Sequence, residues 1–324
     1  MPASQNPSPR TSLRLVIAMF CMVAVPAALT LHRVRVVPAA VPLLPQPSPY
    51  GYTVSLLLFI IPVLVIAFWF LPSEEVKFSR HAFWWTIVLL FPLGALLDFF
   101  FAQYFFVFPN AGATLGIGAP ALGHSVPVEE YIFYFTGFLA VLLLYIWFDE
   151  YWLAAYSVPA TAESRITFDR LLHVHPWSLA IAVVLIAAGI AYKKLFSVDP
   201  AGLPGYFLFL VLVALLPSGL LLPSARPFIN WRALSLTMFL MLLVSLMWEV
   251  TLALPYGWWG FQNGQIIGLH VTAWSGLPIE EVFLWVAVTY ATVIVYEIVK
   301  RWKASGRPLW HAFCGHATGS AAHQ

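Results

Sequence analysis

The chain has 324 residues, of which 61% are hydrophobic and only 9% are charged, whereas an ordinary soluble domain has roughly 25% charged residues. So few charges cannot cover the surface of a water-soluble protein of this size. Two cysteines are too few for a secreted disulfide scaffold, an aromatic content of 16% excludes a disordered chain, and a net charge of +2 is too small to indicate nucleic-acid binding. The composition therefore predicts an integral membrane protein whose first partner is the lipid bilayer.

Long apolar runs predict eight transmembrane helices, and the runs lack the two-residue alternation of membrane barrel strands. We therefore expect an all-α, multi-pass fold. The predicted spans are residues 13–31, 54–72, 83–107, 127–148, 176–195, 203–223, 231–255 and 278–299. The first run follows two arginines and so also resembles a signal peptide. Its length of about 18 residues favours a retained first span.

Lysine and arginine residues predict how the chain crosses an inner or cell membrane. The N-terminus and alternate connections hold 12 of the 16 basic residues, and the opposite side holds only Arg33, Arg35, Lys193 and Lys194. Because basic residues concentrate on the cytoplasmic side, both termini are predicted to be cytoplasmic. The connections 108–126 and 256–277 contain neither lysine nor arginine and are predicted to face outward.

An internal repeat organises the acidic residues. Pro127-Val128-Glu129-Glu130 recurs 151 residues later (278 − 127) as Pro278-Ile279-Glu280-Glu281, and the same offset carries Asp98 onto Glu249. It also carries the apolar run 54–72 onto 205–223. We infer two parallel four-helix repeats, residues 1–150 and 176–303, joined by a polar linker (151–175) and followed by a disordered tail (304–324). The repeats are expected to surround an axis along the membrane normal.

The duplicated acids are candidates for chemistry. Pro-x-Glu-Glu is a favourable helix start in any protein, since proline suits the first helical position and acids suit the first turn. In this chain, however, the glutamates stand at a membrane boundary, and an acid at membrane depth costs on the order of 2.5–3.5 kcal/mol. Six acids are predicted to converge without a lysine or arginine nearby: Asp98, Glu129, Glu130, Glu249, Glu280 and Glu281. Like-charge repulsion then favours a carboxyl pair that shares a proton and can both donate and accept one.

Aromatic residues surround these acids in the sequence. Some belong to the aromatic belts that form at membrane interfaces. Others are candidates for a pocket in which ring faces stabilise a carbocation, and we expect Tyr134, Trp248, Trp274 and Trp285 to line it. His124 and His270 lack a second histidine at ligand spacing, so we expect no metal, and no other cofactor is predicted.

The paired Pro-x-Glu-Glu motifs, each preceded by an acid in Leu97-Asp98 or Trp248-Glu249, resemble those of the membrane-integral lycopene cyclases. The stretch from Ile266-Ile267-Gly268 through the second motif to Tyr296-Glu297 is especially similar. The resemblance covers residues 95–150 and 245–300. It implies cofactor-free, redox-neutral cyclisation of the ψ end groups of lycopene to β-ionone rings, in company with other carotenoid enzymes.

Carried over by resemblance, Glu129, Glu130, Glu280 and Glu281 are acid/base candidates, and Asp98 and Glu249 are supporting acids. Two alternatives stay open at this point. A proton- or cation-coupled transporter would also use intramembrane acids and repeats. A related polyene enzyme, such as a C50 carotenoid cyclase or a hydratase, would use the same acid.

Overall fold

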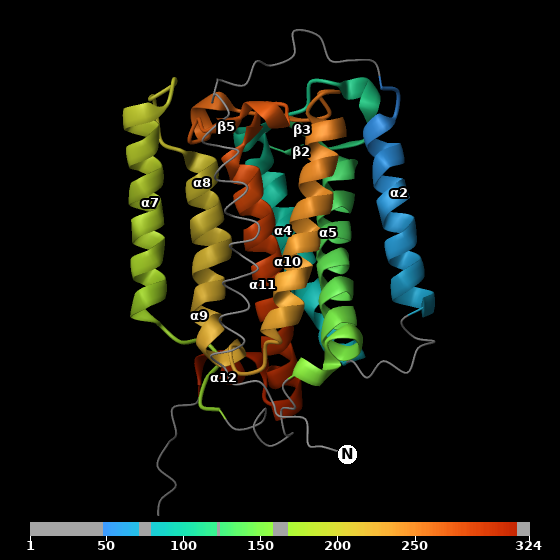
Figure 1. Ribbon diagram of the computed structural model, residues 1–324, viewed down its shortest axis with the longest axis vertical. Helices are drawn as coiled ribbons and strands as arrows, with labels where there is room; N and C mark the ends of the chain where they lie inside the picture. Colours follow the sequence, from blue (N-terminus) through green and yellow to red (C-terminus); the bar gives the residue numbers. More distant parts are fainter. Residues whose placement is uncertain (1–47, 71–78, 122–123, 158–167, 316–324) are drawn as a thin grey trace, which may run out of the picture.

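The computed structural model describes residues 48–70, 79–121, 124–157 and 168–315. In this part of the chain, seven helices are long and apolar enough to cross a membrane, and they stand side by side (Figure 1). These spans are Gly51–Phe68, Arg80–Phe105, Val128–Trp152, Pro176–Phe196, Gly205–Ala225, Trp231–Ala253 and Ile279–Ser305. The all-α, multi-pass fold is thereby confirmed, while the first predicted span (13–31) lies outside the described residues.

Several spans contain π-helical segments. The helices are α2 (Gly51–Val65), α4 (Arg80–Phe105), α5 (Val128–Trp147), α7 (Pro176–Phe196), α8 (Gly205–Phe209), α9 (Leu216–Ala225), α10 (Trp231–Trp248), α11 (Ile279–Ser305) and α12 (Leu309–Cys314). The π-helical segments are η1 (Ile66–Phe70), η3 (Phe148–Trp152), η5 (Leu210–Leu215) and η6 (Glu249–Ala253). Short 3₁₀ turns are η2 (Ala111–Ala113), η4 (Ala154–Tyr156), η7 (Asn263–Gln265) and η8 (Thr272–Trp274).

Helices α5 and α11 form the centre of the bundle. They contact each other, and each also contacts α4 and α10. The contact between α4 and α5 has a counterpart between α10 and α11, and that between α2 and α5 has a counterpart between α9 and α11. Tyr145 on α5 and Tyr296 on α11 meet edge to face, with ring centroids 6.2 Å apart.

The helices α4 and α10 begin in the same way, 151 residues apart. Ser79 accepts a hydrogen bond from the Ala82 N–H, and Asn230 accepts one from the Ala233 N–H, each at 3.2 Å. Serine and asparagine are favoured caps because their side-chain oxygen satisfies an N–H that has no partner within the helix.

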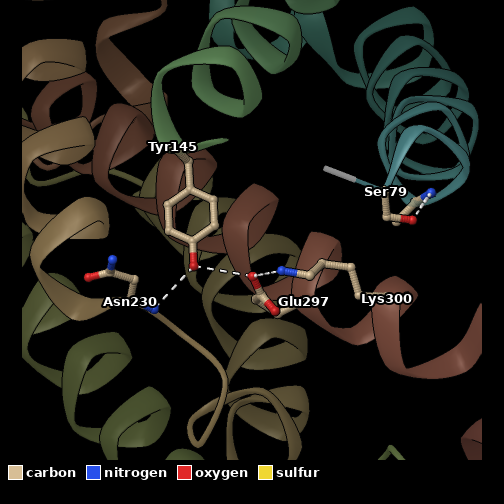
Figure 2. A network of polar contacts seen from close by, with 6 residues as sticks. Ser79, Tyr145, Asn230, Glu297 and Lys300 are labelled. Atoms are coloured by element: carbon tan, nitrogen blue, oxygen red, sulfur yellow. Dashed lines mark hydrogen bonds and ion pairs between the residues drawn. The ribbon is translucent and has the colours of Figure 1, made fainter. Parts of the chain in front are cut away.

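A buried polar network ties three helices together at this end (Figure 2). Glu297 accepts hydrogen bonds from Tyr145 at 3.2 Å and from Lys300 at 2.7 Å, the latter an ion pair. The Asn230 N–H donates to the Tyr145 hydroxyl at 3.2 Å. A buried charge is tolerated when it is paired and hydrogen-bonded, so this network joins α5, the start of α10 and α11.

Short strands cover the opposite end of the bundle (Figure 1). The three antiparallel pairs are β1 (Phe106–Val107) with β4 (Gly260–Phe261), β2 (Gly118–Ala121) with β3 (His124–Pro127), and β5 (His270–Val271) with β6 (Leu277–Pro278). The pair β1–β4 joins the two halves of the chain, with Phe106 opposite Phe261. Each of the other two pairs leads directly into α5 or α11 and so fixes where that helix begins.

The end of the chain differs from the prediction. The disordered tail was expected over residues 304–324, yet α11 continues to Ser305 and Leu309–Cys314 form α12. Main-chain hydrogen bonds run from the Leu171 N–H to the Ala312 carbonyl and from the Leu172 N–H to the Phe313 carbonyl. The prediction is wrong for 304–314 because Ala312 is buried in the core and the partly buried Phe313 packs against Trp302. Residues 316–324 lie outside the described part.

Candidate active site

Each Pro-x-Glu-Glu motif joins a strand to a helix. Pro127 and Pro278 are the last residues of β3 and β6, with extended backbones at ψ 143° and 144°. The next N–H donates to a loop carbonyl: Val128 to Ile117 at 2.9 Å, and Ile279 to Leu269 at 3.0 Å. The proline therefore precedes the first helical position in which it was expected. The two glutamates that follow lie in the first helical turn, as predicted.

The first glutamate of each motif fastens an outer loop to its helix. Glu129 Oε1 accepts hydrogen bonds from the Leu115 N–H at 2.7 Å and from the Thr53 hydroxyl at 2.5 Å. Glu280 Oε1 accepts one from the Ile267 N–H at 2.5 Å. The residue after each donor N–H is a glycine with positive φ, 72° at Gly116 and 90° at Gly268. Glycine adopts this conformation without steric cost, so both loops turn in the same way to reach their glutamate.

A lysine accompanies the second of these loops. The buried Lys193 at the end of α7 donates to the Ile266 carbonyl at 2.8 Å and interacts electrostatically with Glu280. The expectation that no lysine or arginine would lie near the six acids is therefore wrong at Glu280. Hydropathy placed Lys193 at a span end, but it could not show that the side chain turns inward.

The second glutamate of each motif lies inside the bundle, against a tyrosine. The Tyr52 hydroxyl donates to Glu130 Oε1 at 2.7 Å, and the Tyr206 hydroxyl donates to Glu281 Oε1 at 2.8 Å. Both tyrosines are buried, with 0% and 2% of their surface exposed. Consecutive helical residues point in different directions, which is why neighbouring glutamates have different partners.

These tyrosines were missed in the sequence because the register of the first apolar run was wrong by three residues. Tyr52 and Tyr206 are separated by 154 residues (206 − 52), whereas the offset of 151 had been applied to the run 54–72. Both tyrosines follow a glycine that begins a helix, Gly51 or Gly205. This recurring Gly-Tyr was the available signal, but a continuous apolar run offers nothing else that fixes its register.

The remaining two acids complete an inner carboxyl cluster of Asp98, Glu130, Glu249 and Glu281. Glu249 Oε1 accepts a hydrogen bond from the Trp285 indole at 2.6 Å, and the Glu249 and Glu281 carboxyl groups lie beside each other. Two adjacent carboxylates that are buried away from water repel each other, and a proton held by one of them removes this repulsion. The position of this pair therefore favours a shared proton.

Asp98 is the member of the inner carboxyl cluster with the fewest partners. It is 4% exposed, and neither of its carboxyl oxygens has a well-formed hydrogen bond within the described residues. The Tyr134 side chain is its near neighbour, and Asp98 interacts electrostatically with Glu130. Glu130 in turn interacts with Glu281. The structure thus brings together four of the six acids predicted to converge, while Glu129 and Glu280 lie toward the loops.

Two apolar cavities lie on opposite sides of α5 and α11. The wide cavity, about 430 Å³, lies among α4, α5, α8–α9 and α11, and Asp98, Tyr134 and Tyr206 are in its wall. The narrow cavity, about 130 Å³, lies among α2, α5 and α10, and Trp248 and Trp285 are in its wall. Trp274 lies in η8 between β5 and β6 and is not among the described residues that line either cavity.

His270 shapes the outer turn of the second half. Its imidazole is buried, and the Nδ1–H donates to the Gly276 carbonyl at 3.0 Å. Burial lowers the pKa of His270 below its ordinary value of 6.5, although the hydrogen bond to Gly276 opposes the shift. Within the described ranges, no group of three histidine, cysteine, aspartate or glutamate side chains is placed to hold a metal ion.

The fold and the site together define a polytopic α-helical membrane protein with a buried carboxyl cluster beside an apolar cavity. No protein-family model, curated protein or solved structure matches this chain. Its function is therefore argued from the arrangement of its own residues.

Proposed function

We propose that this protein is a lycopene cyclase, which converts the ψ end groups of lycopene to β-ionone rings by acid/base catalysis. The observation that carries the proposal is the inner carboxyl cluster. The buried Glu249 and Glu281 carboxyl groups lie beside each other, where a shared proton relieves their repulsion, and Asp98 stands in the wall of a predominantly apolar cavity. A proton donor and a proton acceptor thus lie beside a space suited to a hydrocarbon chain.

The reaction uses what this site offers and is redox-neutral. A carboxylic acid donates its proton to the terminal double bond, and the π electrons form the new C–H bond and leave a tertiary carbocation. A second double bond attacks this cation and closes a six-membered ring, which moves the positive charge to a ring carbon. A carboxylate then removes the adjacent ring proton, and the C–H electrons form the ring double bond. The proton gained and the proton lost balance, so no oxidant or reductant is consumed.

The side chains around the cluster support each step. Tyr52 and Tyr206 hold Glu130 and Glu281 in fixed orientations. Aromatic rings in the cavity wall, such as Phe101 and Tyr134, stabilise a carbocation through their negative faces. An apolar wall also excludes the water that would capture the cation as an alcohol.

The two glutamates of each motif divide the work. Glu130 and Glu281 belong to the inner carboxyl cluster and are the acid/base candidates, with Asp98 and Glu249. Glu129 and Glu280 bind loop N–H groups, so we assign them a positioning role. This assignment is narrower than the one that the resemblance implies, in which all four motif glutamates are equal acid/base candidates.

The proposal includes an inner- or cell-membrane location with the end that carries α12 in the cytoplasm, as the distribution of basic residues predicts. Lycopene is soluble in the bilayer and would reach the cavity between helices. Other carotenoid enzymes in the same membrane would supply it.

The test is expression in a lycopene-accumulating bacterium, followed by chromatography of the pigments. Wild type is expected to form cyclic carotenes, and Glu130→Gln and Glu281→Gln are expected to lose about 10²–10⁴-fold in rate, the usual contribution of general acid/base catalysis. Asp149→Asn is the matched control because it also removes a buried acid, 19 residues (149 − 130) further along, about 28 Å at the helical rise.

The same chromatogram distinguishes the alternatives. A hydratase would give hydroxylated linear products, and a C50 cyclase would leave lycopene unchanged. A proton-coupled transporter would also leave the pigment unchanged. It would instead change the internal pH of vesicles that contain the protein, and Asp98→Asn would abolish this pH change. Unchanged lycopene with well-inserted wild-type protein would contradict the proposed function.

A further inference from the structure

The two cavities are related to each other by the internal repeat, and each is lined by helices from both halves of the chain. Along α4 and α10 the matching pairs are Leu89/Leu240, Leu90/Met241, Leu93/Val244, Gly94/Ser245 and Leu97/Trp248, all 151 residues apart. Along α11 and α5 they are Leu284/Phe133, Val288/Gly137, Ala291/Ala140 and Val295/Leu144, again 151 apart. Three pairs on the tyrosine-bearing helices, Leu210/Leu56, Val213/Phe59 and Pro217/Val63, follow the offset of 154.

The pair Leu97/Trp248 and a further pair at the same offset, Tyr134/Trp285, make the cavities unequal. Trp248 stands in the narrow cavity where Leu97 stands in the wide one, and its indole packs against Tyr52, Phe133 and Trp259. Trp285 lines the narrow cavity at the position that Tyr134 has in the wide cavity. Its indole N–H donates a hydrogen bond to Glu249. Glu249 is absent from the described wall of the narrow cavity, whereas Asp98, its equivalent, is present in the wall of the wide one. Of these two cavities, as the described residues line them, the wide one offers a carboxyl group to an occupant and the narrow one does not.

The wide cavity also has the shape and the opening that a long hydrocarbon needs. Its wall follows α4 from Leu89 to Phe105, which spans about 24 Å at the helical rise. Leu93 and Phe101 belong to the wall yet keep 50% and 41% of their surfaces exposed. A chain dissolved in the bilayer can thus enter from the side of the helix bundle.

We propose that the wide cavity alone holds the linear polyene, with the reacting end group at Asp98, and that Trp248 and Trp285 close the equivalent site in the other half. This inference rests on the proposed function, since the occupant is the substrate of that reaction. Glu249 and Glu281 then act behind the wall as the proton-holding pair rather than as a second site. Both ends of a symmetric substrate react one after the other in the same cavity, and the monocyclic product must leave and re-enter reversed.

Two alanines provide a matched test of which cavity is occupied. Ala291 lines the wide cavity and Ala140 lines the narrow one, at equivalent positions and with similar partial burial. Ala291→Phe fills the wide cavity, and Ala140→Phe makes the same change in the narrow one. Lycopene retained by each protein after purification in detergent is measured by its absorbance, and cyclic products are measured in the lycopene-making host.

We expect Ala291→Phe to retain about tenfold less lycopene than wild type, which corresponds to about 1.4 kcal/mol, and to lose cyclisation, because the phenyl ring takes up space that the polyene needs. Ala140→Phe should match wild type in both. Size-exclusion profiles check that each variant is folded. A second pair of variants, Leu93→Trp in the wide cavity and Val244→Trp in the narrow one, repeats the comparison at half-exposed positions that accommodate a larger side chain.

Equal losses in both members of a pair, or losses confined to Ala140→Phe and Val244→Trp, would overturn the assignment to the wide cavity. Unchanged lycopene retention in Ala291→Phe and Leu93→Trp would overturn it as well. A failure of the proposed function gives a different result. If wild type retains lycopene, Ala291→Phe does not, and no cyclic product forms in the host, the binding site in the wide cavity is supported and the cyclase assignment is wrong.

Discussion

Removing the carboxyl group of Glu129 should loosen the outer loop without affecting the inner carboxyl cluster. Its Oε1 atom accepts two hydrogen bonds, from the Leu115 N–H at 2.7 Å and from the Thr53 hydroxyl at 2.5 Å. A hydrogen bond to a charged group contributes about 1.5–3 kcal/mol, so Glu129→Ala should lower the free energy of unfolding by about 3–6 kcal/mol. Total stabilities are about 5–15 kcal/mol, so the loss is large enough to measure.

The Glu129→Gln variant distinguishes a structural role of Glu129 in holding the loop from a direct role in acid/base catalysis. Glu129→Gln keeps an acceptor oxygen for both donors and loses only the charge, which strengthens a hydrogen bond about twofold. It should therefore lose about half as much stability as Glu129→Ala and keep most of the cyclase activity. Glu130→Gln should show the reverse, with near-normal stability and little activity.

Thermal unfolding in detergent, followed by tryptophan fluorescence, measures the stability, and hydrogen exchange at the Leu115 amide measures release of the loop. If Glu129→Ala unfolds at the wild-type temperature and leaves that amide protected, the fastening role is wrong. If Glu129→Gln loses activity as completely as Glu130→Gln at unchanged stability, Glu129 is itself an acid/base residue.

Three further predictions concern single contacts. Leu97→Trp should reproduce in the wide cavity the closure made by Trp248, and so lower lycopene retention; retention at the wild-type level would argue against that explanation of the closed half. Tyr206→Phe removes a buried donor to Glu281 and should lower the free energy of unfolding by about 1.5–3 kcal/mol; an unchanged melting temperature would contradict it. The folded pKa of His270 lies below its unfolded value, so its contribution to stability is full above about pH 6.5 and declines as pH falls through the window below. Thermal melts from pH 7 to pH 5 should show a smaller decline in His270→Gln than in wild type, and parallel declines would refute this.

Those parts of the fold that depend on composition and repeated spacing could be predicted from the sequence. Seven spans follow from apolar length alone, and the shared 151-residue offset predicted that six acids converge, of which the structure brings together Asp98, Glu130, Glu249 and Glu281. The division into two repeats is supported by equivalent contacts in the two halves. The membrane orientation and the catalytic function stay predictions.

Other features depended on packing and could not be read from local pattern. The partners of Glu130 and Glu281 were missed because the tyrosines repeat at an offset of 154 rather than 151, and the recurring Gly-Tyr was the one signal of this register. Lys193 was placed correctly along the chain, but the direction of its side chain is decided by the Ile266 carbonyl that receives it. The two neighbouring glutamates of a motif look alike in sequence, and only the helix that carries them turns one toward the loop and the other toward the interior.

Cyclisation of lycopene in deuterated water by the purified protein, reconstituted in lipid nanodiscs without added cofactor, tests the acid/base proposal most directly. Protonation of the terminal double bond introduces one solvent deuteron for each ring, and it is retained because the proton removed comes from a different carbon. We predict cyclic carotenes that are heavier by one deuterium per ring in wild type and absent in Glu130→Gln. Cyclic products without deuterium, or no cyclic product from well-folded wild-type protein, would contradict the proposed chemistry.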